Sequence, residues 1–144
     1  MLAGISNAEM DSLASTLRSD RLQVDVLHVD LADECSIAAL VEKSNEAERV
    51  AIASGIYISS SALTTSRAEI DSVLAINLYG VFFTAQHYAR AMISRKSGSI
   101  VAIGSISGRF PRLGQVAYGA AKLACAKLCG CLPWKQFPMG YVLI

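Results

Sequence analysis

The chain has 144 residues, of which 53% are hydrophobic and 17% charged, so it has enough apolar material for the core of one domain over residues 1–144. The 13 Lys and Arg and 12 Asp and Glu are spread along the chain, which excludes the clustered positive field of a nucleic-acid-binding domain. No apolar run reaches the roughly 20 residues of a membrane helix, and the N-terminus lacks a signal-peptide pattern. We expect a cytoplasmic protein with a small-molecule substrate.

The chain is predicted to open with a helix, because residues 6–9 match a capping box that precedes apolar residues at helical spacing. A β-branched run at residues 22–29 predicts a buried strand that ends at Asp30. Asp33 can then cap a second helix, and residues 50–54 favour the next strand.

A long helix is predicted to begin at a second capping box at Ser66, and Asn77 and Gly80 are positions at which it can bend. A strand follows at residues 99–104, and a last helix begins near Val116. Strands that alternate with helices of this length predict an α/β fold with a doubly wound parallel sheet. Such sheets bind ligands outside the carboxyl ends of their strands.

The four cysteines pose the question of a metal or redox site. They form no CxxC pair, and both histidines lie far from the three cysteines near the C-terminus. The pattern favours reduced, mostly buried thiols that pack as small apolar side chains, and it predicts no metal site. The residues concerned are Cys35, Cys125, Cys129 and Cys131.

Tyr118 and Lys122 lie four residues apart on the last predicted helix, so their side chains share one face. A positive charge beside a phenol favours the phenolate, which suits the pair to acid and base chemistry. Ser105 lies at the carboxyl end of a predicted strand, where its hydroxyl can meet a ligand, and Asn77 is a polar residue on an apolar helix face. Each also has an ordinary alternative: a chance YxxxK spacing, a turn serine, and a helix-bending or capping amide.

Three segments, NLYGVFF from Asn77, GSIVAIGSISGR from Gly98 and AYGAAKLA from Ala117, together resemble the short-chain dehydrogenase/reductase family. The resemblance implies a Rossmann-type domain and a dehydrogenase or reductase that transfers hydride between a nicotinamide cofactor and a secondary alcohol or carbonyl. NAD or NADP is the implied cofactor, and NAD is favoured.

The same resemblance implies a role for each residue of the pattern. Tyr118 would be the acid/base and would also contact the cofactor, and Lys122 would tune it and bind the nicotinamide ribose. Ser105 would bind the reacting oxygen, and Asn77 would support a proton relay. These four residues are the expected catalytic set.

Further cofactor-binding residues are implied at the ends of two predicted strands. Asp30 and Leu31 match the position that receives adenine, although a helix-entry turn is the alternative for Asp30. Ser54, Gly55 and Ile56 stand where the family usually has Asn-Asn-Ala-Gly, and Gly55 still permits close approach of the cofactor.

The family's glycine-rich TGxxxGxG turn, which holds the pyrophosphate at a helix N-terminus, does not occur in these residues. We therefore expect a partial domain that lacks the first two strands and the last strands of the family order 3-2-1-4-5-6-7, and that ends in the sixth strand at residues 141–144. Its strands would either close up or keep unpaired edges.

The segment PRLGQVAYGAAKLA from Pro111 resembles the 2,3-dihydro-2,3-dihydroxybenzoate dehydrogenases, which oxidise a cyclic dihydrodiol with NAD. Ser105 and Arg112 would then contact the substrate, with Arg112 paired to its carboxylate; a solvated loop arginine is the alternative. A 3-oxoacyl-acyl-carrier-protein reductase and an inactive remnant that only self-associates remain as other hypotheses. A homo-oligomer through the helices at 68–95 and 116–132 is implied by the family.

Overall fold

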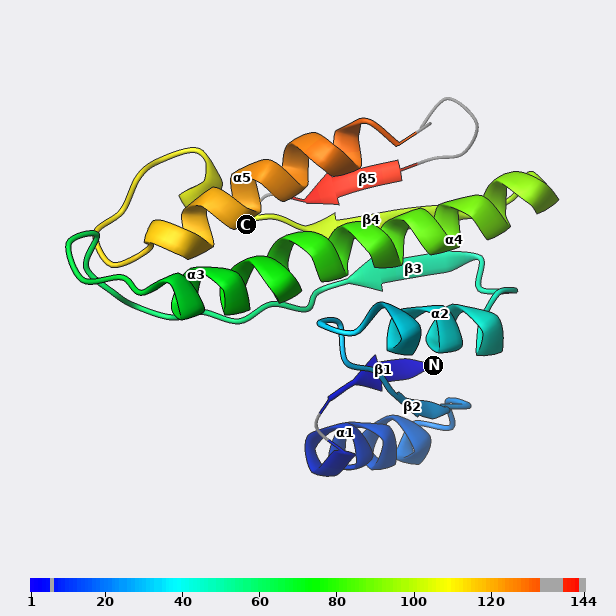
Figure 1. Cartoon of the computed structure of the whole chain (residues 1–144). Helices are drawn as coiled ribbons and strands as arrows, with labels where there is room; N and C mark the ends of the chain where they lie inside the picture. The colour runs from blue at the N-terminus through cyan, green and yellow to red at the C-terminus, as the bar shows by residue number, and fades with distance from the viewer. Residues whose placement is uncertain (6, 133–138, 143–144) are drawn as a thin grey trace.

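The computed structural model in Figure 1 describes residues 1–5, 7–132 and 139–142, and its strands and helices alternate as predicted. In chain order the elements are β1 (Leu2–Gly4), α1 (Asn7–Ser19), β2 (Val26–His28), α2 (Glu34–Lys43), β3 (Arg49–Ile52), α3 (Arg67–Leu74), the π-helical turn η1 (Ala75–Gly80), α4 (Val81–Arg95), β4 (Ser99–Ile103), the 3₁₀ turn η2 (Ile106–Gly108), α5 (Val116–Gly130) and β5 (Met139–Val142). The α/β class is confirmed.

All strand pairs in the described residues are parallel, which confirms the predicted sheet type. They form two separate ladders, β1–β2 and β3–β4–β5. Figure 1 shows the arrows of both ladders pointing the same way, with β1 and β3 as the facing edges. The strands have therefore not closed up into one sheet, and in the part of the chain that is described the facing edges of β1 and β3 have no strand partner.

The helix predicted behind residues 6–9 is present as α1, but a short strand precedes it, so the chain opens with a strand and not with that helix. β1 is only three residues long and contains a glycine, so it offers no periodicity that sequence reasoning could detect. Its partner creates it: Leu2 N donates to Asp25 O at 2.8 Å, and Val29 N donates to Gly4 O at 2.9 Å. The sequence analysis expected the first two strands of the family order 3-2-1-4-5-6-7 to be lacking. Because β1 pairs with β2, only one strand position of that order stays open, between β1 and β3.

Two of the predicted helix starts are confirmed in detail. Asp33 caps α2 by accepting from Cys35 N at 2.9 Å. Ser66 caps α3 in a full capping box, in which its hydroxyl accepts from Glu69 N at 3.2 Å and the Glu69 carboxylate accepts from Ser66 N at 2.7 Å. The cap predicted for α1 at Ser6 lies outside the described residues.

Replacing Ser66 with Ala should lower the free energy of unfolding by about 0.5–2 kcal/mol, because Glu69 N–H loses its acceptor and the Glu69 carboxylate loses the hydroxyl that donates to it. The matched control is Ser72→Ala on the same helix, since the Ser72 hydroxyl only bonds back to Ala68 O at 2.8 Å. Urea denaturation of both variants measures the difference. Equal losses at the two positions would contradict a capping role.

The helix from Arg67 to Arg95 is continuous, and its middle turn is the π-helical η1, at the predicted bend around Asn77 and Gly80. By length and composition alone this helix could cross a membrane, a feature that the sequence analysis missed. Its buried side chains belong to the main core, which also contains residues of β3, β4 and α5. Core members include Val73, Val81, Ala85, Tyr88, Met92, Ile100, Ala102, Ala121 and Cys125.

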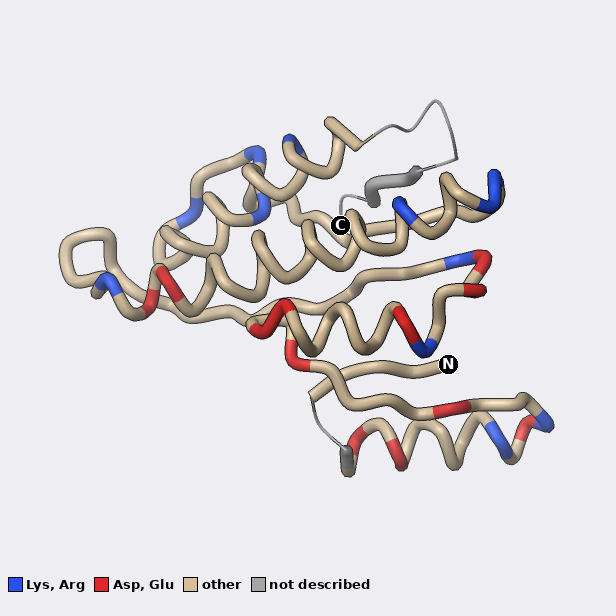
Figure 2. Tube along the Cα trace, turned by 45° about the vertical axis from the view of Figure 1, so that its right-hand side comes forward, with Lys and Arg blue, Asp and Glu red and all other residues tan. Residues whose placement is uncertain are grey.

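The charges are segregated, in contrast to the even spread that composition suggested. No Asp or Glu follows Asp71 in the sequence, whereas eight of the 13 Lys and Arg do. In Figure 2 the acidic residues therefore lie on the side of α1, α2 and α3, and α4 and α5 carry only basic ones. The part of the chain that holds Ser105, Tyr118 and Lys122 is the positive part.

Candidate functional site

Ser105 lies two residues beyond β4 and caps the turn η2. Its hydroxyl accepts from Ser107 N at 3.2 Å, and the residue is 9% exposed. A hydroxyl keeps a donor and a further lone pair after accepting one bond. Ser105 is thus held in place by its own turn and can still donate to an oxygen at the sheet edge.

Lys122 reaches from α5 back to the same edge. It is 5% exposed, and its Nζ donates to Ile103 O at 3.0 Å. The Nζ also lies 5.9 Å from the centroid of the Tyr118 ring. Burial lowers the pKa of Lys122 below its usual 10.5, and the interaction with Cys125 partly opposes this change.

This lowered pKa makes a prediction about stability at alkaline pH. Between the folded-state pKa of Lys122 and 10.5 the unfolded chain binds more protons, so the free energy of unfolding should rise with pH in that window. The Lys122→Met variant should lack this rise, which amounts to at most about 1.4 kcal/mol per pH unit. Urea titrations of both proteins at several pH values measure it, and identical pH slopes would contradict it.

Tyr118 projects from the first turns of α5, and its ring packs edge-on against Tyr57 with centroids 5.5 Å apart. Nothing in the sequence indicated this contact, because Tyr57 lies in an irregular segment 61 positions earlier in the chain. α5 is set against η2 by Gly119, where a Cβ would lie 2.8 Å from Ser107 O. The helix of Tyr118 and Lys122 thereby touches the turn that fixes Ser105.

Gly119→Ala should therefore lower stability by about 1–3 kcal/mol, because the new methyl group meets a backbone carbonyl. Gly130 in the same helix has nothing within 4 Å of its Cβ position, so Gly130→Ala is the matched control. Because Gly130 is the last residue of α5, that control should stay within about 0.5 kcal/mol of the original chain. Thermal or urea unfolding compares the two, and a stabilised Gly119→Ala would mean that α5 and η2 are not in close contact.

Asn77 is fully buried in η1 and binds the backbone after β3. Its Nδ2 donates to Ile56 O at 2.8 Å and to Val73 O at 3.0 Å, while its Oδ1 accepts from Ile56 N at 3.2 Å. At Gly55 a Cβ would lie 2.5 Å from Asn77 Oδ1 and 3.6 Å from Lys122 Nζ. The absence of a side chain at Gly55 therefore leaves room for the Asn77 amide, next to the Lys122 ammonium, at the end of β3.

The predicted cofactor residues at the strand ends line one cavity of about 220 Å³ outside β1, β2 and β3. Asp30 takes part in the turn that was its alternative role, since its Oδ1 accepts from Ala32 N at 2.8 Å. The lining comprises Gly4, Ile5, Val29, Asp30, Leu31, Ser54, Gly55, Ile56 and Ile76. A carboxylate beside apolar walls and a glycine approach suits the nucleoside part of a dinucleotide.

Arg112 is not brought to this cavity. It lies with Arg109 in a separate groove of about 320 Å³, whose α5 residues are Val116, Gly119, Ala120 and Leu123. At 100° per residue these positions lie on a different face of α5 from Tyr118 and Lys122. The same groove is lined by Ser107 and Gly108 of the turn that Ser105 caps, so Arg112 lies in a groove next to that turn.

Cys125 and Cys129 are buried on α5 with their sulfur atoms 3.8 Å apart, and Cys35 and Cys131 are exposed. Hydrogen bonding to Cys125 and burial raise the pKa of Cys129 far above its usual value. Within the described residues, no group of three or more His, Cys, Asp or Glu side chains could hold a metal ion.

Known dehydrogenases and reductases are similar to this chain in sequence. It is 36% identical over 72 residues to the vibriobactin-specific 2,3-dihydro-2,3-dihydroxybenzoate dehydrogenase of Vibrio cholerae, a match that covers 50% of this chain and 28% of that protein. It is 34% identical over 101 residues to the 3-oxoacyl-acyl-carrier-protein reductase of Buchnera aphidicola, covering 65% and 40% respectively. The chain thus spans less than half the length of these curated relatives.

The crystal structure of a metagenomic short-chain oxidoreductase in complex with NADP matches with a TM-score of 0.88 and 22% identity, over 99% of this chain and 67% of that one. This match concerns the fold. A family model described as short chain dehydrogenase matches residues 1–135, which include all the site residues named above. The chain therefore belongs to the short-chain dehydrogenase family, whose members are NAD(P)-dependent oxidoreductases.

Proposed function

We propose that the protein to which this chain belongs interconverts a secondary alcohol and a carbonyl with a nicotinamide cofactor. The observation that supports the proposal is the contact between the turn that Ser105 caps and the helix that carries Tyr118 and Lys122. Ser105, Tyr118 and Lys122 come from two elements, and the Gly119 contact fixes these elements against each other.

Each side chain has a chemical task in this proposal. The Tyr118 hydroxyl removes the proton of the alcohol, or supplies it to the carbonyl in the reverse direction. Ser105 donates to the same substrate oxygen, where negative charge develops. Lys122 places its positive charge beside the Tyr118 ring and is held there by Ile103 O. A bound nicotinamide would supply or accept the hydride.

The residues present fit part of that cofactor. Asp30 and Leu31 would receive the adenine end, and Ser54, Gly55 and Ile56 would lie along the nucleoside at the cavity they line. Lys122 would hold the nicotinamide ribose, since its Nζ lies next to the Gly55 approach. Asn77 would act through Ile56, by fixing the backbone between these two groups. We favour NAD over NADP for this protein.

We propose an anionic substrate, because the half of the chain with the reacting residues is positively charged. The carboxylate of 2,3-dihydro-2,3-dihydroxybenzoate meets this requirement, and a relative that acts on that compound shares 36% identity. A 3-oxoacyl thioester on an acidic carrier protein is the second candidate, favoured by the Buchnera aphidicola relative. Arg112, which lines a groove with Arg109 next to the turn of Ser105, would pair with the carboxylate of the substrate.

The test is an absorbance assay of cofactor reduction and oxidation with each substrate class, with NAD(H) and NADP(H) in parallel. Turnover of the dihydrodiol with NAD supports the proposal, and turnover of 3-oxoacyl thioesters alone moves the protein to the second candidate. If the protein shows no turnover and neither cofactor stabilises it against heat, it is a remnant that only self-associates. We expect self-association to use the helices at 68–95 and 116–132, where Tyr79, Leu123 and Leu128 are exposed.

A further inference from the structure

The buried cysteines Cys125 and Cys129 have no task in the proposed reaction, although they lie next to its residues. The two side chains are 1% and 2% exposed, neither forms a disulfide, and their sulfur atoms lie 3.8 Å apart. At 100° per residue both lie within about 60° of Lys122 around α5, so they extend the face of the helix that carries the reacting residues. We refer to these two side chains as the thiol pair.

The spacing of the thiol pair suits one bridging atom and does not suit a disulfide. Residues four apart on a helix have Cβ atoms about 5–6 Å apart, whereas a disulfide requires about 3.5–4.5 Å. Two sulfur atoms bound to one ion at about 2.3 Å lie about 3.8 Å apart at a tetrahedral angle and about 4.6 Å apart in a linear arrangement. The observed 3.8 Å therefore allows the two sulfur atoms to share an ion with little movement of either side chain.

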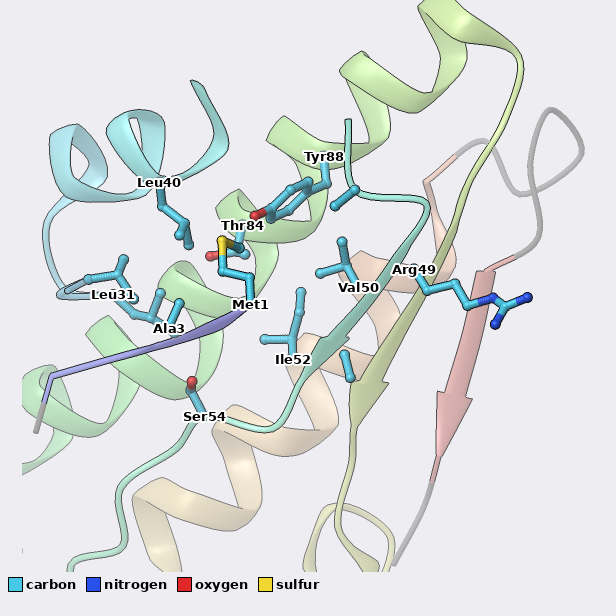
Figure 3. Close-up of a pocket in the computed structure, with 13 residues that line it drawn as sticks. Met1, Ala3, Leu31, Leu40, Arg49, Val50, Ile52, Ser54, Thr84 and Tyr88 are labelled. Carbon is cyan, nitrogen blue, oxygen red and sulfur yellow. The ribbon is translucent and has the colours of Figure 1, made fainter. Parts of the chain in front are cut away.

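The core around the thiol pair favours a soft ion over a hard one. Both cysteines belong to the main apolar core. The hydroxyls that α4 brings to the cavity in Figure 3 already have partners: Tyr88 is hydrogen-bonded to Ser44 Oγ at 2.6 Å, and Thr84 donates to Gly80 O at 2.7 Å. Thiolate ligands select soft ions such as monovalent copper, whereas hard ions prefer oxygen.

The charge balance favours a monovalent ion. Two thiolates and one monovalent cation leave one negative charge, which is costly to bury without a partner. The Lys122 ammonium supplies the opposite charge, since it is itself buried and interacts electrostatically with Cys125. Zinc usually takes four ligands, and within the described residues no group of three His, Cys, Asp or Glu side chains could begin such a site. The expectation of no metal site applies to ions of that kind, whereas monovalent copper needs only two sulfur atoms.

We propose that the thiol pair binds one monovalent copper ion between Cys125 Sγ and Cys129 Sγ. Two S–Cu bonds form, the two S–H protons pass to water, and no electron is transferred because the copper enters in its reduced state. Cys129 lies in the last turn of α5, which ends at Gly130, so local opening of this turn gives the ion access. The proposal does not depend on the oxidoreductase reaction, and its test needs no turnover.

The experiment titrates monovalent copper into the reduced 144-residue chain under argon, in competition with bathocuproine disulfonate, whose absorbance reports the copper that it holds. We expect one copper ion per chain. Cys125→Ala and Cys129→Ala should each weaken binding by more than the roughly 10–100-fold that loss of an outer-shell group costs. Cys35→Ala and Cys131→Ala are the matched controls and should bind like the original chain, because both residues are exposed. Loss of binding in Cys131→Ala, with binding retained in Cys125→Ala, would overturn the proposal.

A second measurement keeps the test decisive if an alanine variant fails to fold. The unmodified chain is treated with iodoacetamide in mild urea, with and without copper, and each alkylated cysteine is identified by peptide mass. Copper should slow the alkylation of Cys125 and Cys129 at least about tenfold and leave that of Cys35 unchanged. Equal rates with and without copper at Cys125 would contradict the site, as would a chain that takes up no copper.

Discussion

Replacing Tyr118 with Phe should lower kcat by about 10²–10⁴-fold in the oxidoreductase that we propose, because the step loses its proton-transfer group. The ring remains, so its edge-on contact with Tyr57 at a centroid distance of 5.5 Å and its place near Lys122 are preserved. Cofactor binding should change little, since the phenol oxygen is not needed for the cavity lined by Asp30 and Gly55. The loss should therefore appear in kcat and only weakly in the affinity for NAD(H).

Tyr79→Phe is the matched control for this loss. Tyr79 lies in η1 and is 52% exposed, so removing its hydroxyl should leave both kcat and cofactor affinity as they were. Steady-state rates and cofactor titration of the two variants make the comparison. Activity of Tyr118→Phe within a few-fold of the unmodified enzyme would assign the proton transfer to another group.

The elements that the sequence predicted are those whose own residues show a local pattern, either a capping residue or a helical period. The capping residues Asp33 and Ser66 form bonds within three positions, and the period of the long helix repeats over many turns, so local physics decides both. β1 has no such signal, because three residues become a strand only through pairing with residues more than twenty positions later. The two-ladder sheet follows from pairing as well, and no periodicity encodes it.

In the candidate site, too, the local features could be predicted from the sequence and the distant contacts could not. The spacing of Tyr118 and Lys122 on one helix is local, so their common face could be predicted. The partners of the site are distant in sequence or belong to the backbone: Tyr57 packs on Tyr118, and Ile103 O receives Lys122 Nζ. A carbonyl has no side-chain identity, so no pattern of residue types can reveal it.

Asn77 is the residue of the site whose partners lie furthest from what the sequence could predict, because it binds the backbone of Ile56. We expect Asn77→Ala to destabilise the fold. Truncation leaves Ile56 N–H and Ile56 C=O without their partner, and a polar group left unsatisfied at a buried site costs about 1–3 kcal/mol. Because the two Ile56 groups are only partly buried, we expect a total loss of about 1–3 kcal/mol, which is still a sizeable share of the ~5–15 kcal/mol that stabilises an ordinary domain. Asn77→Asp should be no better, because it removes the two donated bonds and buries a charge.

Asn45→Ala provides the comparison, because Asn45 is exposed and uses only its backbone carbonyl, which accepts from Arg95. It should stay within about 0.5 kcal/mol of the original chain in urea denaturation. If Asn77→Ala were equally harmless, the hydrogen bonds of the amide to Ile56 would not stabilise the fold, and the role of Asn77 would be proton transfer alone. If it is as costly as expected, the residue supports the cofactor cavity first, because Asn77 binds the backbone of Ile56 and Ile56 lines that cavity.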